Sequence, residues 1–481
     1  MAGPIPDNRA LSRLSPAQRE AALALATRWQ EAGEELFLVG GLVRDALLGR
    51  PVPSDLDLTT SALPERTQAL ATEAGAASIF TIGERFGTVG AVFGDGADQV
   101  VAEITTYRAE HYPDDTRFPS VRYGVGLTDD LARRDFTANA IAADPLTGDL
   151  IDPFGGEGDI ALGVLRAVGD PDERFAEDPL RLLRAARFVA QLGFRIDPAT
   201  EAAMSRNAKS LGRISQERIY AELVRLLAGE WADHGLEALR RTELLPVALP
   251  ELAPMAAEAG IDPRHRANRE KDLWAHTLQV VVQAPPRPMV RWAALLHDAA
   301  KPLVRGIDET GDVHFFGHER AGADLAGRLL RRLKADKATI AGVTRLVELH
   351  GRPAAYEPDW TDSAVRRLAL EAGERWDDLL DLAAADVTSG RAHKRKQAAR
   401  RVELLRAHDA RLREEADLAR LQSPLDGNAL MAMFGRGPGI WIKQVKDHLR
   451  ELVIDGDLAP GDVAAAEDIA RAWMAAQDSE S

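Results

Sequence analysis

Hydrophobic and polar positions divide this chain into a mixed first part and a helical remainder. Up to about residue 163, short apolar runs separated by glycine turns alternate with segments of helical period. The expected strands are 36–39, 55–58, 78–81, 87–93 and 99–106, and the expected helices are 16–32, a segment around Arg44, and 65–74. From residue 179 onwards the apolar positions recur at helical spacing, with breaks near 285–286, 351–358 and 424–427. We therefore predict an α+β fold, in which a small mixed α/β head precedes an all-α body.

Composition limits the possible classes of protein. A chain of 481 residues is too long for one hydrophobic core, so we expect three or four domains. No apolar run approaches the ~18 residues that span a bilayer and no secretion signal is visible, so we expect a cytoplasmic protein with no membrane partner. The absence of cysteine leaves Asp, Glu and His as metal ligands. The net charge of −15 argues against nonspecific coating of nucleic acid, although local basic faces can still hold a structured RNA.

The end of the first predicted strand carries the strongest chemical signal. Gly40 and Gly41 form a turn into a helix that carries Arg44, which brings backbone N–H groups and a guanidinium to a place suited to a triphosphate. Asp55 and Asp57 are two residues apart in a strand, so both carboxylates project from one face and can bind the same divalent ions. Two magnesium ions roughly 3.5–4 Å apart are the usual solution for nucleotidyl transfer. A glycine turn followed by a solvated acidic loop is the alternative, but the order of the four features favours a nucleotide-polymerising site.

Two further groups fit the same chemistry. Glu103, in a strand expected beside the Asp-x-Asp strand, is the candidate third carboxylate; the alternative is an outward-facing acid on a half-exposed strand. Arg133 and Arg134 precede Asp135 and Asn139, and such a cluster can hold a triphosphate or a ribose while one member orients the others. Helix capping by Asp135 is the plainer interpretation, but it does not explain the double arginine.

The predicted helix after residue 177 carries a polar stripe. Asp178 is the expected N-cap with Pro179 at the first helical position, and Arg181, Arg184 and Arg187 follow at intervals of three residues. A carboxylate beside a guanidinium presents an acceptor next to donors. Cytosine and adenine offer the complementary edge, whereas guanine and uracil present the reverse. The stripe therefore predicts selection of CTP and ATP, and an exposed helix with salt bridges between its turns is the alternative.

These segments together resemble a known family. The runs LVGGLVRDALLG, SDLDLTT, AEITTYR, RRDFTANAIA, EDPLRLLRAARF and SQERIYAELVRLL occur in the order found in bacterial tRNA CCA-adding enzymes and their poly(A) polymerase relatives, the class II nucleotidyltransferases. The resemblance covers roughly residues 30 to 230. It implies that tRNA, ATP and CTP are the partners and that bases are selected by protein side chains without a nucleic-acid template.

The resemblance also implies roles for individual residues. Asp55 and Asp57 would bind Mg²⁺, and Gly41, Arg44 and one arginine of the pair 133–134 would contact the nucleotide. Asp178 and Arg181 would template the base, and Arg184 and Arg187 would help to hold the phosphates.

Two segments bear on which member of the family this is. Residues 83–89 resemble the CCA-adding form, whereas poly(A) polymerases tend to be more basic there. Residues 109–119 are polar, show no clear helical or strand period, and are similar to the flexible loop of CCA-adding and A-adding enzymes. We expect addition of CCA, or at least of its terminal A, and an A-adding enzyme or a poly(A) polymerase remains the alternative.

A second chemistry lies further along the chain. Histidines and aspartates on neighbouring helices can build a divalent metal site with nitrogen and oxygen ligands. The candidate ligands are His276, His297, Asp298, His318, His350 and Asp386. The pattern resembles the HD phosphohydrolase domain, with Ala300 where that family often has glycine. It implies a transition metal or Mg²⁺, and either hydrolysis of phosphomonoesters or 2′,3′-cyclic phosphates at RNA ends or a scaffold without activity.

We expect four domains in this order: a catalytic head at 1–165, a helical neck for base recognition and RNA binding at 166–265, an HD domain at 266–410, and a helical tail at 411–481. Basic clusters at 328–337 and 391–401 and a glycine-rich turn at 435–439 can contact tRNA backbone, but ordinary exposed helix faces and a plain helix connection explain them equally well. A phosphohydrolase whose head only binds nucleotide and a noncatalytic RNA-binding protein are the alternatives from other classes.

Overall fold

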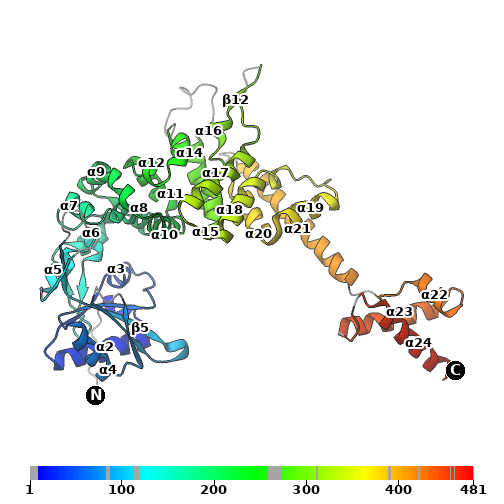
Figure 1. The fold of residues 1–481 in the computed structure, drawn as a ribbon, viewed down its shortest axis with the longest axis horizontal. Coiled ribbons are helices and arrows are strands. Elements are labelled where there is room, and N and C mark those ends of the chain that lie inside the picture. The colour runs from blue at the N-terminus through cyan, green and yellow to red at the C-terminus, as the bar shows by residue number, and fades with distance from the viewer. Residues whose placement is uncertain are drawn as a thin grey trace. The chain divides into compact units, whose positions relative to one another are not determined.

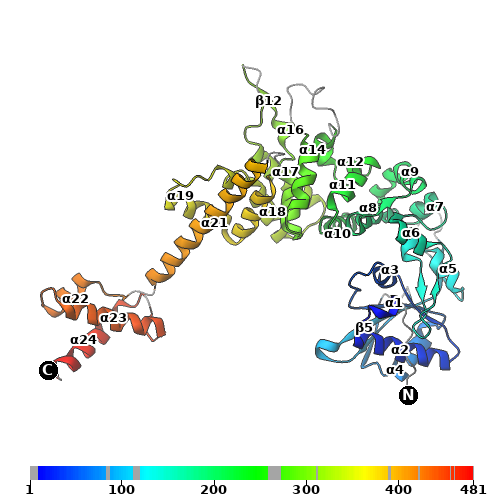
Figure 2. The same cartoon turned by 180° about the vertical axis from the view of Figure 1, so that it is seen from behind.

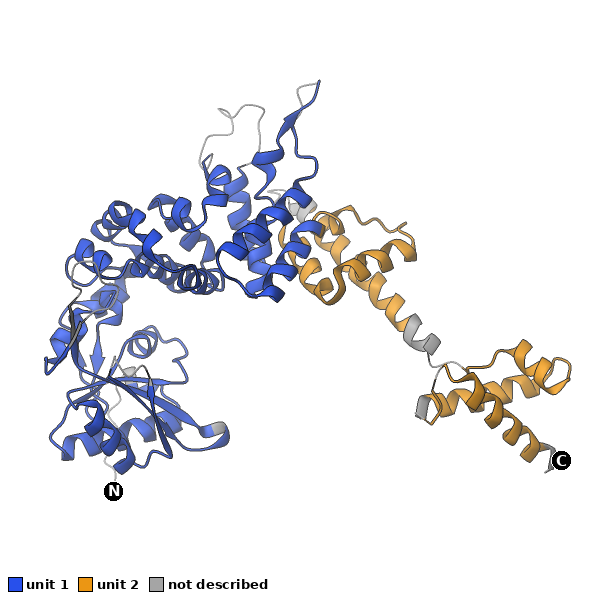
Figure 3. Cartoon of the chain, in the orientation of Figure 1, with its two compact units in different colours: residues 1–348 blue, residues 349–481 orange. Residues whose placement is uncertain are grey.

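The chain folds into two compact units, residues 1–348 and 349–481 (Figure 3). This computed structural model describes residues 9–82, 87–111, 120–257, 272–309, 313–387, 392–420, 423–455, 457–459 and 461–479. Among these residues, no helix combines the length and the apolar character that crossing a membrane requires.

A seven-stranded mixed sheet forms the head, as the sequence predicts. Its strand order is β3-β4-β5-β2-β1-β8-β9. The strands are β1 Leu36–Val39, β2 Leu56–Thr60, β3 Ser78–Ile82, β4 Thr88–Phe93, β5 Val100–Thr106, β8 Ala142–Ala143 and β9 Leu150–Ile151. Only β2 and β5 pair in parallel in this order, and their register places Asp57 opposite Glu103. The strand expected from Asp55 begins one residue later, at Leu56.

Helices cover the sheet. They are α1 Arg9–Ser12, α2 Pro16–Glu31, α3 Gly41–Leu47, α4 Pro64–Glu73, α5 Leu127–Ala132 and α6 Gly156–Leu162. Figures 1 and 2 show α2 and α4 side by side against the sheet. Ser15 and Gln18 form a capping box that starts α2, and buried Trp29 donates a 2.7 Å hydrogen bond to Thr60 Oγ1. The helix is thereby fixed to β2, the strand that carries Asp57.

The neck follows the head within the first unit and consists mainly of helices. They are α7 Pro171–Glu177, α8 Leu180–Leu192, α9 Pro198–Asn207, α10 Gln216–Leu227, α11 Ala232–Arg241, α12 Leu245–Ala248 and α13 Ala253–Ala256. Close packing of α11 on α8 requires Gly235, because a Cβ there would lie 2.8 Å from the carbonyl oxygen of Ala186. The expected helix start is wrong by one residue: Pro179 occupies the N-cap, and Asp178 lies between α7 and α8.

The body is mostly helical, as the sequence predicts, and short strand pairs accompany its helices. In the neck, β10 Val164–Leu165 pairs in parallel with β11 Arg195–Ile196. Further on, β12 Gly306–Ile307 pairs with β13 Val313–His314. Each strand has only two residues, too few to show the alternation that marks a strand in a sequence. The body is therefore mostly helical.

The remaining helices of the first unit follow the neck directly. They are α14 Leu273–Gln283, α15 Pro288–Leu296, α16 Lys301–Val304, α17 His318–Arg332 and α18 Lys337–Leu349. Buried Arg291 on α15 donates to the carbonyl oxygens of Leu227 and Ala284, at 3.2 and 2.7 Å. Because those carbonyls lie at the ends of α10 and α14, this one guanidinium satisfies helix termini of both the neck and the next helical layer.

The second unit is helical in its described part. Its helices are α19 Asp362–Ala372, α20 Trp376–Ala385, α21 Ala392–Arg420, α22 Gly427–Phe434, α23 Ile440–Asp455 and α24 Val463–Ser479. The last three share a core that includes Leu430, Val445, Leu449 and Ala470. The predicted basic cluster at 391–401 falls on α21, described from Ala392, and the turn at 435–439 connects α22 to α23.

The sequence shows no strand period in the polar stretch that follows Arg108, but the structure forms two strands there, one on each side of residues 112–119. β6 Arg108–His111 pairs antiparallel with β7 Ser120–Tyr123. Residues 112–119 lie outside the described residues, and so do residues 83–86 of the segment that resembles the CCA-adding form.

Candidate active site

A cavity of about 640 Å³ lies between the head and the neck, within the first unit. It brings together ten of the residues predicted for the transferase site. They are Gly40, Gly41, Arg44, Asp57, Arg133, Arg134, Asp178, Arg181, Arg184 and Arg187. Asp55 and Glu103 do not line it. Backbone from α3, β2 and the turn at residues 133–139 supplies one wall, and α8 and α10 supply the other.

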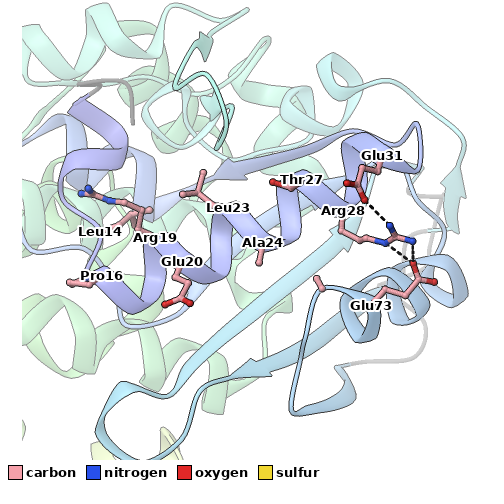
Figure 4. A pocket seen from close by; sticks show the side chains of 11 residues that line it. Leu14, Pro16, Arg19, Glu20, Leu23, Ala24, Thr27, Arg28, Glu31 and Glu73 are labelled. Atoms are coloured by element: carbon pink, nitrogen blue, oxygen red, sulfur yellow. Dashed lines mark hydrogen bonds and ion pairs between the residues drawn. The ribbon is translucent and has the colours of Figure 1, made fainter. Parts of the chain in front are cut away.

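A second pocket, of about 780 Å³, runs along the outer face of α2 and contains none of these residues. Arg28 lies there between Glu31 and Glu73, and its hydrogen bonds to them are 2.7 and 2.6 Å (Figure 4). Arg19, Glu20 and small or apolar side chains such as Leu14 and Leu23 complete the lining. This pocket contains two arginines beside three glutamates, so the arginine-rich cavity is the better candidate for a nucleotide site.

The glycine turn lies against the carboxylate of Asp57. Gly40 has φ +73°, and a Cβ on it would lie 2.7 Å from Asp57 Oδ2 and 3.1 Å from Arg134 Nη1. Glycine is therefore required both by the backbone conformation and by the approach of two functional side chains. Arg133 has a different partner, because its Nε and Nη2 donate to Asp130 Oδ1 at 2.9 and 2.8 Å. Of the two arginines, Arg134 is the one beside Asp57.

The predicted carboxylates are positioned by β2 and β5. The parallel register sets Asp57 beside Glu103, whereas Asp55 precedes β2 and is exposed. Burial raises the pKa of Asp57 above its ordinary value, Arg134 opposes this shift, and the charge of Glu103 adds to it. The three side chains do not converge here to within 4.8 Å of one another. Neighbouring carboxylates repel each other when both are charged. A divalent cation with oxygen ligands offsets that repulsion, so these groups fit such a site.

A chain of hydrogen bonds connects the head to the neck. Arg44 Nη1 donates to Asn139 Oδ1 at 2.7 Å, and Asn139 Nδ2 donates to Asp135 Oδ1 at 2.9 Å. Arg184 Nε then donates to Asp135 Oδ2 at 2.8 Å. Burial disfavours the charged form of Asp135, but Arg184 and Asn139 outweigh it, so the pKa of Asp135 lies below its ordinary value. Asp135 thus orients Arg184 directly and Arg44 through Asn139, one from each wall. Arg184 lines the cavity while it is paired with this carboxylate.

Three guanidinium groups surround the ring of Phe188. The Cζ atoms of Arg187, Arg44 and Arg184 lie 4.2, 5.2 and 5.6 Å from the ring centroid. Arg187 Nε also lies 2.7 Å from Glu222 Oε2, and burial lowers the pKa of Arg187 to about 10. Arg181 and Arg187 are only 7% and 8% exposed, which excludes the alternative of a solvated helix face. This cluster of positive charge is suited to a polyphosphate.

The predicted base-reading pair has a third member that sequence reasoning missed. Asp178 Oδ1 accepts from the backbone N–H of Leu180 at 3.1 Å, and Asp178 Oδ2 lies 3.2 Å from Arg218 Nη2. Arg218 comes from α10 and also lines the cavity. It stands in the run SQERIYAELVRLL, but its partner is forty residues away, so no local spacing connects the two.

The histidine cluster forms part of a second site. Ligand atoms of His276, His297 and Asp298 lie within 4.8 Å of one another, and His318 Nε2 lies 3.6 Å from Asp298 Oδ1. His297 Nδ1 is 2.8 Å from the carbonyl oxygen of Ala294, and His318 Nδ1 is 2.9 Å from that of Phe315. These contacts leave both Nε2 atoms directed at the cluster, as in metal sites whose histidines are oriented by backbone carbonyls.

Asp298 is the buried acid of this cluster. Burial raises its pKa, but His297, His276 and Lys301 outweigh burial, so the pKa of Asp298 lies far below its ordinary value. Lys301 Nζ is 2.6 Å from Asp298 Oδ2. His350 and Asp386 belong to the second unit, and their place in the site stays a prediction.

Three family descriptions match successive parts of the chain. "Poly A polymerase head domain" matches residues 36–166, "Probable RNA and SrmB- binding site of polymerase A" matches 193–255, and "HD domain" matches 274–391. The two nucleotidyltransferase regions together supply every residue of the cavity from the head and from α10, while α8 falls mostly between them. The nucleotidyltransferase and HD regions both imply divalent metals.

Relatives match over nearly the whole length. A CCA-adding enzyme of Geobacillus sp. (strain WCH70) is 32% identical over 91% of this chain and 93% of its own length. That of Geobacillus thermodenitrificans (strain NG80-2) is 32% identical, also over 91% and 93%. The crystal structure of the Bacillus stearothermophilus CCA-adding enzyme in complex with CTP is similar with a TM-score of 0.60 and 27% identity, covering 97% of this chain and 100% of that chain. The chain therefore belongs to the family of bacterial CCA-adding enzymes, the class II nucleotidyltransferases with an HD domain.

Proposed function

We propose that this chain adds CCA to tRNA 3′ ends from CTP and ATP, and that the cavity between head and neck is where it does so. One observation carries the assignment to this cavity. The carboxylate of Asp57, the phosphate-binding arginines Arg44 and Arg134, and the base-reading carboxylate of Asp178 line the same space. A nucleoside triphosphate needs these three kinds of group, and the family to which the chain belongs supplies the reaction and the substrates.

The carboxylates at β2 and β5, of which Asp57 lines the cavity, are proposed to hold Mg²⁺. Asp55 and Asp57 are the proposed ligands, and Glu103 is their proposed neighbour on β5. The donor set fits because it consists of carboxylate oxygens, and the carboxylate of Asp57 lies against the glycine turn. When bound, two such ions activate the attacking 3′-hydroxyl and stabilise the leaving pyrophosphate.

The phosphates are proposed to lie along the positive wall. The backbone N–H groups of Gly40 and Gly41 face the start of α3, where the helix dipole favours an anion. Arg44 and Arg134 offset the charge of the triphosphate from the head side. Arg184 and Arg187 contribute positive charge from α8, although each already has a carboxylate partner within the protein.

The base is proposed to be read by Asp178 and Arg181. A carboxylate accepts from the amino group of cytosine or adenine, and a guanidinium donates to the adjacent ring nitrogen. Uracil and guanine would place a carbonyl oxygen against Asp178, so that one acceptor faces another. Selection of two bases by one pair of side chains follows from this shared donor–acceptor pattern.

One assay tests the proposal. Purified protein is given tRNA ending before, within or just short of CCA, together with labelled CTP or ATP. We expect CTP to be added to the bare end and ATP to complete it. Addition of A alone would indicate an A-adding enzyme, and long A tracts would indicate a poly(A) polymerase. Asp55→Ala and Asp57→Ala should each abolish incorporation with the fold intact, whereas Asp98→Ala, outside the cavity, should not; substantial transfer by either of the first two would contradict the metal assignment.

A second activity is favoured by the cluster of His276, His297 and Asp298. We propose that it holds a divalent transition metal or Mg²⁺, that His318, His350 and Asp386 complete the site, and that it hydrolyses phosphomonoesters or cyclic phosphates at RNA ends. The expected result is opening of a 2′,3′-cyclic RNA end to a 2′- or 3′-phosphomonoester, or phosphate release from an RNA that ends in such a monoester. Either activity should be retained in Asp57→Ala and lost in Asp298→Asn. We also propose the four-part division at residues 165, 265 and 410 as the functional organisation.

A further inference from the structure

Asp178 is held by two contacts from opposite directions. The backbone N–H of Leu180 donates to one carboxylate oxygen at 3.1 Å, and Arg218 Nη2 lies 3.2 Å from the other. The side chain of Asp178 is 27% exposed, so the carboxylate faces the cavity without being buried in it. Leu180 starts α8 and Arg218 lies in the first turn of α10. The orientation of the proposed base-reading acceptor is therefore set jointly by two helices.

Arg181 is largely committed to contacts within the protein. Its Nη1 donates to Glu177 Oε2 at 2.7 Å and to the carbonyl oxygen of Arg174 at 3.0 Å. Its Nη2 donates to the carbonyl oxygen of Arg133 at 2.8 Å. Both hydrogens of Nη1 and one of Nη2 are thus used to hold the guanidinium in place. Arg181 is held in place, but within the described part of the chain it forms no hydrogen bond or ion pair with Asp178, so it does not orient that carboxylate.

We propose that Arg218 is a specificity-determining positioning residue: through its ion pair with Asp178 it keeps that carboxylate turned toward the base edge of the cavity. The inference rests on the proposed function and goes beyond it, because it assigns base discrimination to a residue of α10. Arg218 acts on the nucleotide only through Asp178. The side chain of Arg218 is 53% exposed, so it is not part of the hydrophobic core.

The consequence for selectivity follows from the geometry. A carboxylate with one oxygen held by the Leu180 N–H and the other by Arg218 cannot rotate without losing a contact. It therefore presents only acceptors, which attract the amino group of cytosine and repel the carbonyl oxygen of uracil. Without Arg218, only the hydrogen bond to the Leu180 N–H constrains the carboxylate, and the penalty against uracil falls.

The test compares nucleotide discrimination in full-length variants. For Arg218→Ala, we expect the ratio of kcat/KM for CTP over UTP, on a tRNA lacking CCA, to fall about fivefold, the size expected of a half-exposed charged pair. The change should come mainly from a higher KM for CTP and a lower KM for UTP, with kcat for CTP nearly unchanged. Arg218→Lys, which keeps the charge, should retain most of the discrimination. Arg213→Ala, an exposed arginine just before α10 that does not line the cavity, is the matched control.

A double-mutant cycle separates positioning from a structural role. In an Asp178→Asn background, Arg218→Ala should cause no further change in the CTP-to-UTP ratio, because its partner is already gone. Equal losses for all four nucleotides, a lowered unfolding temperature with an unchanged ratio, or additive effects in the double variant would overturn the inference. Affinities for CTP and UTP measured by calorimetry without primer give the same comparison without turnover. If the wild-type protein failed to extend tRNA, the proposed function would fail, and these affinities would still decide the role of Arg218.

Discussion

Asn139 Oδ1 accepts a 2.7 Å hydrogen bond from Arg44 Nη1 across ninety-five residues of sequence. Both residues are buried, and the same amide donates to Asp135. Replacing Asn139 with alanine removes the acceptor that holds this guanidinium at the proposed phosphate site. We expect KM for CTP and for ATP to rise together by about tenfold, the effect of losing one charged hydrogen bond. Asn207→Ala, whose amide binds Asp172 outside the cavity, should leave both constants unchanged. A selective effect on one nucleotide would contradict a role in phosphate binding.

Gly40→Ala should inactivate the enzyme. A Cβ at this position overlaps Asp57 Oδ2, so the carboxylate must move, and the φ of +73° adds backbone strain. Displacement of a catalytic group by about 1 Å lowers kcat/KM by about a hundredfold, and that loss is the expected result. Gly33→Ala is the matched control, since Gly33 has φ +74° and nothing within 4 Å of the added Cβ. It should show a similar drop in unfolding temperature with normal incorporation; equal activity losses in both variants would contradict the steric explanation.

Arg184→Ala should destabilise the protein in a manner that depends on pH. The folded-state pKa of Asp135 is depressed, so its ionisation stabilises the fold above the unfolded value, about 3.9. That contribution is lost as pH falls through the folded pKa. Without Arg184, a buried carboxylate has lost its main partner, and the free energy of unfolding should drop by about 3 kcal/mol at pH 7.

The difference in the free energy of unfolding between wild type and Arg184→Ala should shrink below about pH 4, where Asp135 can take up a proton in the variant. Urea unfolding at pH 7 and at about pH 3 measures it. Arg206→Ala, which breaks an exposed pair with Asp172, is the control and should cost little at either pH. A difference between wild type and Arg184→Ala that is independent of pH would show that Arg184 stabilises through packing alone.

Asp298→Asn should remove bound metal from the HD site while nucleotide addition continues. The substitution leaves two histidines without the anionic ligand that lies between them and Lys301. Elemental analysis after dialysis against Mn²⁺ should show less metal than in wild type, and CTP incorporation should be unchanged because none of these residues lines the transferase cavity. His234→Ala, an exposed histidine, should retain wild-type metal content. Full metal content in Asp298→Asn would place the ion elsewhere.

Local periodicity was sufficient for most elements of the head. The strands that became β1 to β5 and the helices that became α2 and α4 were predicted to within about two residues, because each depends on neighbours two to four positions apart. Predictions failed where elements were very short. The two-residue strands of the body and the paired flanks of the segment at 112–119 carry too few residues for a recognisable period.

In the candidate active site, too, some features could be predicted from the sequence and others only from the fold. The sequence alone determined which chemical groups are present: a glycine turn, an Asp-x-Asp pair, a double arginine, a carboxylate with arginines at helical spacing, and a histidine–aspartate set. Only the tertiary structure decided their partners. Register put Asp57 opposite Glu103, and packing of α10 on α8 put Arg218 against Asp178. Spacing fixes which side chains share a face of one element, whereas contacts between elements depend on how buried surfaces pack, and that information is distributed over the whole chain.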